Sequence, residues 1–328
     1  MLLSIVVPCF REEASLPHLH QALSEQVEPL DLEVEMLFVD DGSPDGTLDV
    51  LRELAGRDSR VRYLSLSRNF GKESALLAGL EHAAGDAVLI MDADLQHPPT
   101  LLPLMLARMT EGFDQVVARR TRQGDPFRRT FLARTYYRLI NRLIDVRLMD
   151  GAGDFRLLSR RAVDALLAMP ERNRFSKGLF SWIGFPTVMV EYENVVRTAG
   201  SSSWTFRRLV NYGLDGVLSF NDRPLRLLVH LGGAVTLLSL TYIVWLLARA
   251  ALYGIDQPGY LTLVSAVLML GGLQLLALGI LGEYIGRIYY EAKARPAYLL
   301  REGNVAPPHA GELPFPPHRA DRQSGRAS

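Results

Sequence analysis

Two carboxylates separated by one residue stand directly after a short apolar run. Asp92 and Asp94 follow the run 87–91, and Gln96 and His97 come next. Carboxylate oxygens are preferred ligands of hard cations such as Mg²⁺ and Mn²⁺, which also bridge phosphate oxygens. A cation held here would neutralise charge on a departing nucleoside diphosphate. An acidic, solvated turn is the alternative, but the position at the end of an apolar run favours a metal site.

A second acidic cluster begins with Asp40 and Asp41, directly after the apolar run 33–39. A carboxylate at a strand end can accept hydrogen bonds from a nucleobase N–H or a ribose hydroxyl. Ser43 and Asp45 are typical of residues that cap a following helix. We therefore interpret Asp40 and Asp41 as facing a ligand, while the later residues begin a helix.

The first half of the chain alternates short apolar runs with amphipathic stretches, which predicts an α/β fold with a parallel sheet between two layers of helices. Ligands of such sheets lie beyond the carboxyl ends of the strands, and the polar clusters fall at those ends, so one crevice collects them. We expect strands at 2–7, 33–39, 61–66, 87–91 and 114–118, and helices at 16–25, 47–55, 72–84 and 100–111.

The chain changes character near residue 222. Segment 227–248 contains no formal charge apart from one that His230 can carry, and segment 260–281 contains none. Because a helix of about 20 residues spans the hydrocarbon core of a bilayer, the two segments predict a transmembrane hairpin. The alternative is a pair of buried helices in a soluble core, but soluble helices of this length usually keep a polar face.

Arginines and lysines flank this hairpin on both sides, and positive residues favour the cytoplasmic face of a membrane. We therefore expect the catalytic domain and the C-terminus to be cytoplasmic. Residues 201–226 predict interfacial helices that lie on the bilayer, with packing on the core as the alternative. The expected division is a catalytic domain at 1–200, interfacial helices at 201–226, transmembrane helices at 227–288 and a tail at 289–328, disordered from about 303.

The composition limits the other classes of function. The chain has 36 basic and 36 acidic residues and a formal net charge of zero. This balance argues against binding to nucleic acid, which depends mainly on excess Lys and Arg. Cys9 is the single cysteine, so an intrachain disulfide and a cysteine-based zinc cluster are excluded.

Several separated motifs resemble those of family 2 glycosyltransferases of the dolichol-phosphate mannose synthase type, and most closely the bacterial polyprenyl-phosphate (bactoprenol) glucosyltransferases. The resemblance extends from residue 2 to about residue 300. The motifs are PCFREE at 8–13, DDGSPD at 40–45, LSRNFGKE at 66–73, DADLQHPP at 92–99, DFRLLS at 154–159, the stretch 171–184 and GEYIGR at 282–287.

The resemblance implies a GT-A (Rossmann-like) nucleotide-sugar domain with a metal-bound donor, the cation being Mg²⁺ or Mn²⁺. The residues that it places around the nucleoside are Pro8, Phe10, Glu12, Asp40 and Asp41. Those at the metal and the diphosphate are Asp92, Asp94 and Gln96, and Asp154 lies near the reacting sugar. Lys72 either contacts the diphosphate or forms a structural ion pair. Arg119, Arg128 and Arg129 face the lipid phosphate or the diphosphate, since arginine suits bidentate phosphate binding.

Two motifs depart from the family pattern. Phe10-Arg11 stands where the family usually has Tyr-Asn, so the ring can stack on a base but lacks a hydroxyl. Ser202-Ser203-Trp204 stands where the family has a lysine between serine and an aromatic residue. We therefore assign no phosphate-binding role to Ser203, and a neighbouring Arg207 or Arg208 is the candidate replacement.

The predicted reaction is inverting transfer of a sugar, with glucose and a UDP-sugar favoured, to polyprenyl (undecaprenyl) phosphate for cell-envelope glycan or lipid modification. A lipid monophosphate is already ionised near neutral pH and needs no strong base. The expected location is the bacterial inner membrane, as a multi-pass protein in contact with lipids, with a tetramer or dimer as an open alternative for its assembly. The alternatives are another sugar, such as an aminoarabinose derivative or mannose, and a non-catalytic membrane scaffold.

Overall fold

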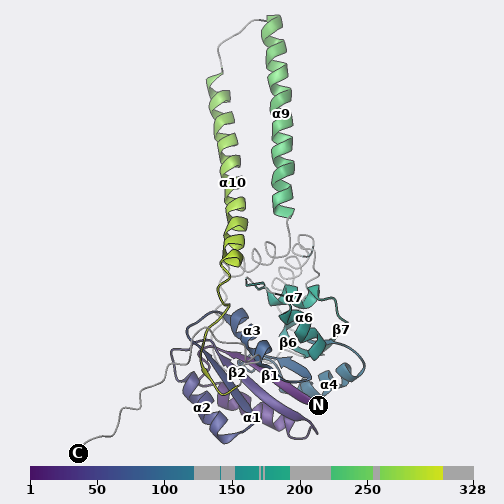
Figure 1. Cartoon of the computed structure of the whole chain (residues 1–328). Helices are drawn as coiled ribbons and strands as arrows, with labels where there is room; N and C mark the ends of the chain where they lie inside the picture. The colour runs from purple at the N-terminus through teal and green to yellow at the C-terminus, as the bar shows by residue number, and fades with distance from the viewer. Residues whose placement is uncertain are drawn as a thin grey trace, which may run out of the picture.

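In the part of the chain that the structure describes, eight strands form one mixed sheet in the order β7-β5-β6-β4-β1-β2-β3-β8. The sheet and its helices lie at one end of the molecule (Figure 1). The computed structural model describes residues 1–121, 141, 152–169, 171–172, 174–192, 223–253 and 259–305. The strands are β1 (Leu2–Cys9), β2 (Glu33–Asp40), β3 (Val61–Leu66), β4 (Ala87–Ile90), β5 (Gln115–Arg120), β6 (Ala152–Ser159), β7 (Thr187–Tyr192) and β8 (Leu300–Gly303).

The central strands β4, β1, β2 and β3 are parallel, as predicted. Strand β6 runs antiparallel to β4 and β5, and β8 runs antiparallel to β3. The alternation of strands and helices predicted neither of these two antiparallel strands. The carboxyl ends of β1 to β4 and the beginning of β6 therefore lie at the same end of the strands.

Successive side chains of a strand point to opposite sides of the sheet. Both faces of the sheet are apolar, and helices cover both of them. Ile5 of β1 belongs to the core cluster beneath α1, α2 and α4, whereas Val6 belongs to the cluster beneath α3, α6 and α7. The helices are α1 (Leu16–Val27), α2 (Thr47–Arg57), α3 (Lys72–His82), α4 (Leu102–Thr110) with the preceding 3-10 turn η1 (Pro99–Leu101), α6 (Arg160–Leu167) and α7 (Ser176–Trp182).

Helix α3 packs closely against β1 and β2 at Gly79. A Cβ atom at this position would lie 2.3 Å from Val6 Cγ1 and 3.3 Å from Val39 Cγ2. The absence of a side chain at Gly79 therefore sets the distance of α3 from the sheet, and with it the position of Lys72 at the start of the helix.

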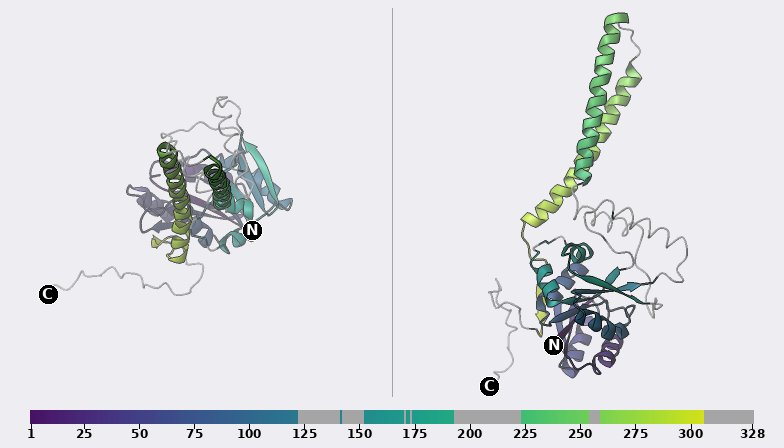
Figure 2. Two further views of the ribbon diagram at one scale, coloured as in Figure 1. Left: turned by 90° about the horizontal axis from the view of Figure 1, so that it is seen from above. Right: turned by 90° about the vertical axis from the view of Figure 1, so that its right-hand side faces the viewer.

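Two long helices, α9 (Arg223–Tyr253) and α10 (Tyr260–Ala292), extend side by side away from the sheet (Figures 1 and 2). Large apolar side chains of α10 are exposed, among them Leu275 at 72%. In the part of the chain that the structure describes, one stretch, Met269–Ala292, is long and apolar enough to cross a bilayer, with a mean hydropathy of 1.4. The predicted pair of spans at 227–248 and 260–281 stays a prediction, and most of the expected interfacial segment 201–226 lies outside the described residues.

After α10 the chain returns to the sheet and adds β8 beside β3. Arg52 of α2 forms a two-pronged ion pair with Glu302, with distances of 2.9 Å from Nε to Oε1 and 2.8 Å from Nη2 to Oε2. The backbone N–H of Tyr63 donates to Asn304 Oδ1 at 2.7 Å. Residues 300–304 therefore pack with the sheet domain, although the sequence placed them in a separate tail. Their partners are more than 200 residues away in the chain and leave no local pattern.

Candidate active site

One cavity of about 320 Å³ lies at the carboxyl ends of β1 to β4. Residues that the sequence predicted for nucleotide, metal or catalysis form much of its lining. These residues are Pro8, Phe10, Glu12, Asp41, Lys72, Asp92 and Asp94. Cys9, Asn69, Gly71, Ala75 and Ala93 complete the wall. The structure thus brings four polar clusters of the sequence to one place.

The pairing of β4 with β6 brings Asp92 and Asp154 together. Arg156 lies opposite Ile90 at the end of this antiparallel ladder, so Asp154 and Asp92, each two residues from this pair, lie at the same end of the ladder. Lys72 joins them, because its Nζ lies 2.5 Å from Asp92 Oδ1 and 2.5 Å from Asp154 Oδ2. Like charges on paired strands repel, so the ammonium stabilises an otherwise unfavourable pair.

The charges of this triad reinforce one another. Burial alone would lower the pKa of Lys72, but the charges of Asp154 and Asp92 outweigh it and raise that pKa above its usual value. Burial alone would raise the pKa of Asp154, but the charges of Lys72 and Lys177 hold it below its usual range. At neutral pH Lys72 is therefore an ammonium and Asp154 a carboxylate.

The turn after β4 is fixed by local hydrogen bonds and by His97. The N–H of Gln96 donates to Asp94 Oδ1 at 3.2 Å, and the N–H of Asp92 donates to His97 Nδ1 at 3.3 Å. The imidazole stacks on Phe155 of β6 with ring centroids 5.0 Å apart, and burial lowers the pKa of His97. Gln96 is half-buried and is not part of the cavity wall, so its contact with metal or diphosphate stays a prediction.

The neighbouring carboxylates Asp40 and Asp41 have different surroundings. Asp40 is buried, and its oxygens accept hydrogen bonds from the Ser43 N–H at 2.9 Å and the Ser65 hydroxyl at 2.8 Å. Asp41 reaches the cavity wall, where its oxygens accept the N–H groups of Phe70 at 2.7 Å and Gly71 at 2.9 Å. Both side chains thus brace the loops of the site, and nucleoside contact by either stays a prediction.

Phe10 and Glu12 form the wall beyond β1. The Phe10 side chain is large, apolar and 40% exposed, which gives a flat surface on which a base can stack. The Glu12 carboxylate accepts a hydrogen bond from the Ser15 hydroxyl, and the Glu12 N–H donates to Thr47 Oγ1 at 3.0 Å. The chain after β1 is thereby tied to the beginning of α2.

Of the three predicted arginines, the structure describes only Arg119, which does not line the cavity. Arg119 of β5 forms an ion pair with Glu191 of the neighbouring strand β7, with 3.7 Å between Nη1 and Oε1. Arg128 and Arg129 lie outside the described residues, as does Ser203. Contact of these three arginines with a phosphate stays a prediction.

Two supporting contacts were not predicted from the sequence. Arg156 stacks its guanidinium on the Phe180 ring, 3.7 Å from the centroid, and its Nη2 donates to the Gly153 carbonyl at 2.8 Å. Glu73, next to Lys72, accepts hydrogen bonds from the Ser176 hydroxyl and from its N–H at 3.2 Å. Arg156 lies in the motif DFRLLS and Glu73 in the motif LSRNFGKE. The spacing of the motifs does not show that Arg156 contacts Phe180 or that Glu73 contacts Ser176.

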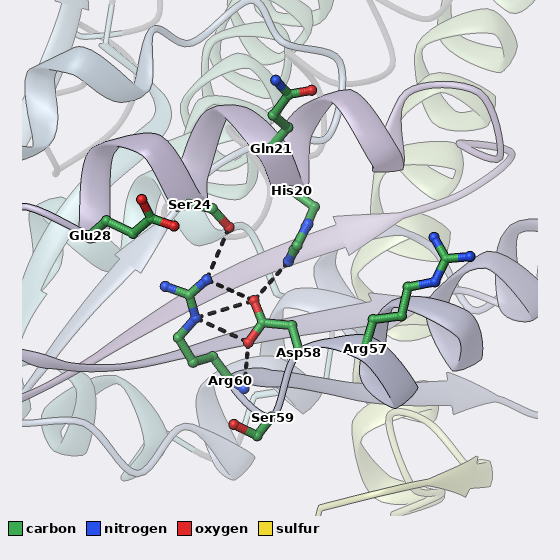
Figure 3. A pocket seen from close by; sticks show the side chains of 8 residues that line it. All are labelled: His20, Gln21, Ser24, Glu28, Arg57, Asp58, Ser59 and Arg60. Atoms are coloured by element: carbon green, nitrogen blue, oxygen red, sulfur yellow. Dashed lines mark hydrogen bonds and ion pairs between the residues drawn. The ribbon is translucent and has the colours of Figure 1, made fainter.

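A larger cavity of about 510 Å³ lies away from this site, between α1 and the turn before β3 (Figure 3). His20 Nε2 lies 2.9 Å from Asp58 Oδ2, and Arg60 Nη2 donates to the same Asp58 oxygen at 2.8 Å and to Ser24 Oγ at 3.2 Å. Arg60 precedes the first residue of β3, so this cavity lies at the amino ends of the strands. Four of its polar residues, His20, Ser24, Asp58 and Arg60, are thus joined to one another, which is typical of a structural network.

The acidic residues of the site fit a divalent cation that is shared with a substrate. Among the residues that the structure describes, no three His, Cys, Asp or Glu side chains form a cage for a metal. Asp92 and Asp94 nevertheless line the same cavity, and Asp92 already holds a cation, the ammonium of Lys72. Mg²⁺ is usually bound by one or two carboxylates together with substrate phosphates, and this donor set matches that description.

Comparisons with known proteins identify the family of this chain. Residues 4–167 match glycosyl transferase family 2, and residues 223–288 match the GtrB C-terminal hairpin. A protein of Bacillus subtilis (strain 168) named as a glycosyltransferase, CsbB, is 53% identical over 93% of this chain and 92% of its own length. The SfII prophage-derived bactoprenol glucosyl transferase of Shigella flexneri is 41% identical over 94% of this chain and 100% of its own.

A third relative is the prophage bactoprenol glucosyl transferase homolog of Escherichia coli (strain K12). It is 40% identical over 92% of this chain and 99% of its own length. The mixed sheet between two helical layers is the Rossmann-like GT-A architecture that the motifs implied. This chain therefore belongs to glycosyl transferase family 2 and carries the GtrB type of C-terminal hairpin.

Proposed function

We propose that this protein transfers a sugar, with glucose favoured, from a nucleotide-sugar to polyprenyl phosphate, and that a UDP-sugar is the preferred donor. The observation that carries the proposal is the single cavity in which Phe10, Glu12, Lys72, Asp92 and Asp94 meet. The names of two relatives, which describe bactoprenol glucosyl transferases, support the sugar and the acceptor.

The donor occupies the cavity with its base against Phe10 and its diphosphate near Lys72. An exposed aromatic ring provides stacking for a base, and an ammonium provides a charge for phosphate oxygens. Asp92 and Asp94 hold a divalent cation, Mg²⁺ or Mn²⁺, which supplies charge neutralisation for the leaving nucleoside diphosphate when it is bound.

The acceptor phosphate attacks the anomeric carbon directly, and the anomeric configuration is inverted. Because a phosphate monoester is ionised near pH 7, the site needs to position two anions rather than to generate a strong base. Asp154 lies close to the reacting sugar in this arrangement and either orients a sugar hydroxyl or accepts a proton. Its carboxylate is ionised at neutral pH because Lys72 and Lys177 lower its pKa against the effect of burial.

The acceptor arrives from the bilayer along the hairpin. Helix α10 exposes apolar side chains over much of its length, and its foot contacts the segment before α7, where the Arg172 N–H donates to Glu291 Oε1 at 3.0 Å. Positive residues around the hairpin favour a cytoplasmic sheet domain. The proposed location is therefore the bacterial inner membrane, with the hairpin crossing it twice. Assembly as a dimer or tetramer is consistent with this location.

Product analysis tests this proposal directly. Purified protein is incubated with Mg²⁺ or Mn²⁺, undecaprenyl phosphate and a panel of nucleotide-sugars, and the lipid products are identified by mass spectrometry. We expect undecaprenyl phosphate carrying one hexose, formed best from UDP-glucose. Formation of a lipid product from another donor alone would replace glucose by that sugar. Absence of any lipid product, in protein that still binds nucleotide, would contradict the transferase proposal and favour a scaffold.

A further inference from the structure

We propose that Lys72 is a built-in counter-ion that holds the Asp92–Asp154 pair in the donor-free site and moves to the donor diphosphate when a divalent cation binds. The proposal rests on the proposed function and deepens it, because it describes how the same site couples metal binding to nucleotide binding. It concerns an electrostatic device formed by the chain itself.

The first argument is the geometry of the two carboxylates. Asp92 follows β4 and Asp154 lies near the start of β6, and the ladder between these strands ends at the pair Ile90–Arg156, two residues from each. The two side chains are 31% and 17% exposed, so water screens their repulsion only in part. A cation between them is needed, and the Lys72 ammonium lies at 2.5 Å from each.

The second argument is that the backbone of Lys72 is fixed while its side chain has room. Both oxygens of Asp41 bind N–H groups of the residues just before Lys72, at 2.7 and 2.9 Å. Glu73 is bound to Ser176 of α7. The Lys72 side chain is 46% exposed and lines the cavity. Four methylene groups therefore allow the ammonium to move within the cavity without any movement of α3.

Two consequences follow for ligand binding. A divalent cation that enters alone competes with the ammonium for Asp92, so it binds weakly. A nucleoside diphosphate offers Lys72 another anion and leaves the carboxylates to the cation. Metal and nucleotide therefore favour each other's binding, and by linkage the coupling is the same in both directions.

The test measures binding of Mn²⁺ itself, by electron paramagnetic resonance of the free ion, to the full chain in detergent with and without UDP. Lys72→Met removes the competing charge. We expect this variant to bind Mn²⁺ alone at least about fivefold more tightly than the unchanged protein, and to show a correspondingly smaller gain on adding UDP. Lys72→Arg keeps the charge and is expected to keep the weak binding of Mn²⁺ alone.

Lys293→Met is the matched control, because it removes the same charge at the foot of α10, where Lys293 lies over the Tyr289 ring. It is expected to bind Mn²⁺ as the unchanged protein does. Equal or weaker binding of Mn²⁺ alone to Lys72→Met would overturn the proposal. If that variant does not fold, Lys72→Gln serves for the same comparison. Failure of UDP to bind the unchanged protein would contradict the donor assignment, whereas the comparison with Mn²⁺ alone would still decide the role of Lys72.

Discussion

Arg172 and Glu291 join the sheet domain to the foot of the C-terminal hairpin. The Arg172 N–H donates to both carboxylate oxygens of Glu291, at 3.0 and 3.2 Å, and its Nε donates to the Arg295 carbonyl at 2.6 Å. Four residues after Arg172, Ser176 is bound to Glu73, the neighbour of Lys72. A short series of contacts thus links α10 with Glu73 and Lys72 at the cavity.

Glu291→Ala is expected to raise the KM for undecaprenyl phosphate by about five- to tenfold, while the KM for the nucleotide-sugar stays unchanged. The physical reason is the loss of hydrogen bonds, each contributing about 1 kcal/mol, that hold the foot of α10 against the segment before α7. Glu291→Gln keeps one acceptor oxygen and is the matched control, with a smaller effect. Steady-state kinetics with each substrate varied in turn measures both constants, and an equal rise in both would contradict a role in acceptor positioning.

Asp94→Ala is expected to lower kcat for sugar transfer by at least about a hundredfold without a change in Tm. Loss of a cation ligand removes charge stabilisation of the leaving group, which contributes several kcal/mol. Asp49→Ala removes an acid that is 78% exposed on α2 and should keep full activity. Transfer assays with thermal unfolding of each variant measure the two effects. Full activity of Asp94→Ala would rule out the proposed metal site.

Gly79→Ala is expected to destabilise the sheet domain by about 1–3 kcal/mol, because the added methyl overpacks the core. The new Cβ would lie 2.3 Å from Val6 Cγ1. Gly56→Ala is the control within α2, where nothing lies within 4 Å of the added atom. It should stabilise by up to about 1 kcal/mol, since alanine favours a helix more than glycine does. Apparent Tm values of the two variants should shift in opposite directions.

The Asp58 network in Figure 3 predicts a specific dependence of stability on pH. Hydrogen bonds from Arg60, together with one from His20, hold the pKa of Asp58 below its usual range against the effect of burial. A depressed folded-state pKa means that the stabilisation is present above the unfolded value of about 4 and is lost as the pH falls below it. Asp58→Asn should therefore lower Tm at pH 7.

The same substitution should have a progressively smaller effect below about pH 4. Thermal unfolding between pH 7 and pH 3 measures the difference between the two proteins. Glu53→Gln is the control, because Glu53 pairs with Arg57 on the surface of α2 and is 57% exposed, and we expect little change at any pH. A constant difference between Asp58→Asn and the unchanged protein across this range would contradict the assignment.

Sequence patterns predicted the elements around the site closely, because each is short and strongly periodic. The expected strand 61–66 coincides with β3, and the expected helix 72–84 ends two residues after α3 (Lys72–His82). The family resemblance was confirmed over the catalytic domain and the hairpin. Local periodicity could not predict β6 and β8, because their partners are distant and their orientation is opposite to that of the strands they join.

The same limit applies to individual carboxylates. Asp40 and Asp41 are adjacent, and a strand end turns successive side chains in different directions, so composition alone did not show that Asp40 is buried against Ser65. The contact of Lys72 with both Asp92 and Asp154 depends on the register of β6 with β4. The sequence left diphosphate contact and a structural ion pair open for Lys72. The structure shows the ion pair, and the counter-ion proposal includes both.

Strands β7 and β8 are the two edges of the sheet, and α9 and α10 come between them in the chain. During translation the ribosome must therefore complete both long helices before the last strand emerges. Until then, β3 presents an unpaired edge, of the kind to which strands of other chains add. The sheet therefore gains its last strand, β8, only after the hairpin has been synthesised. A nascent chain that stalls within the hairpin is left with β3 as an exposed, aggregation-prone edge strand.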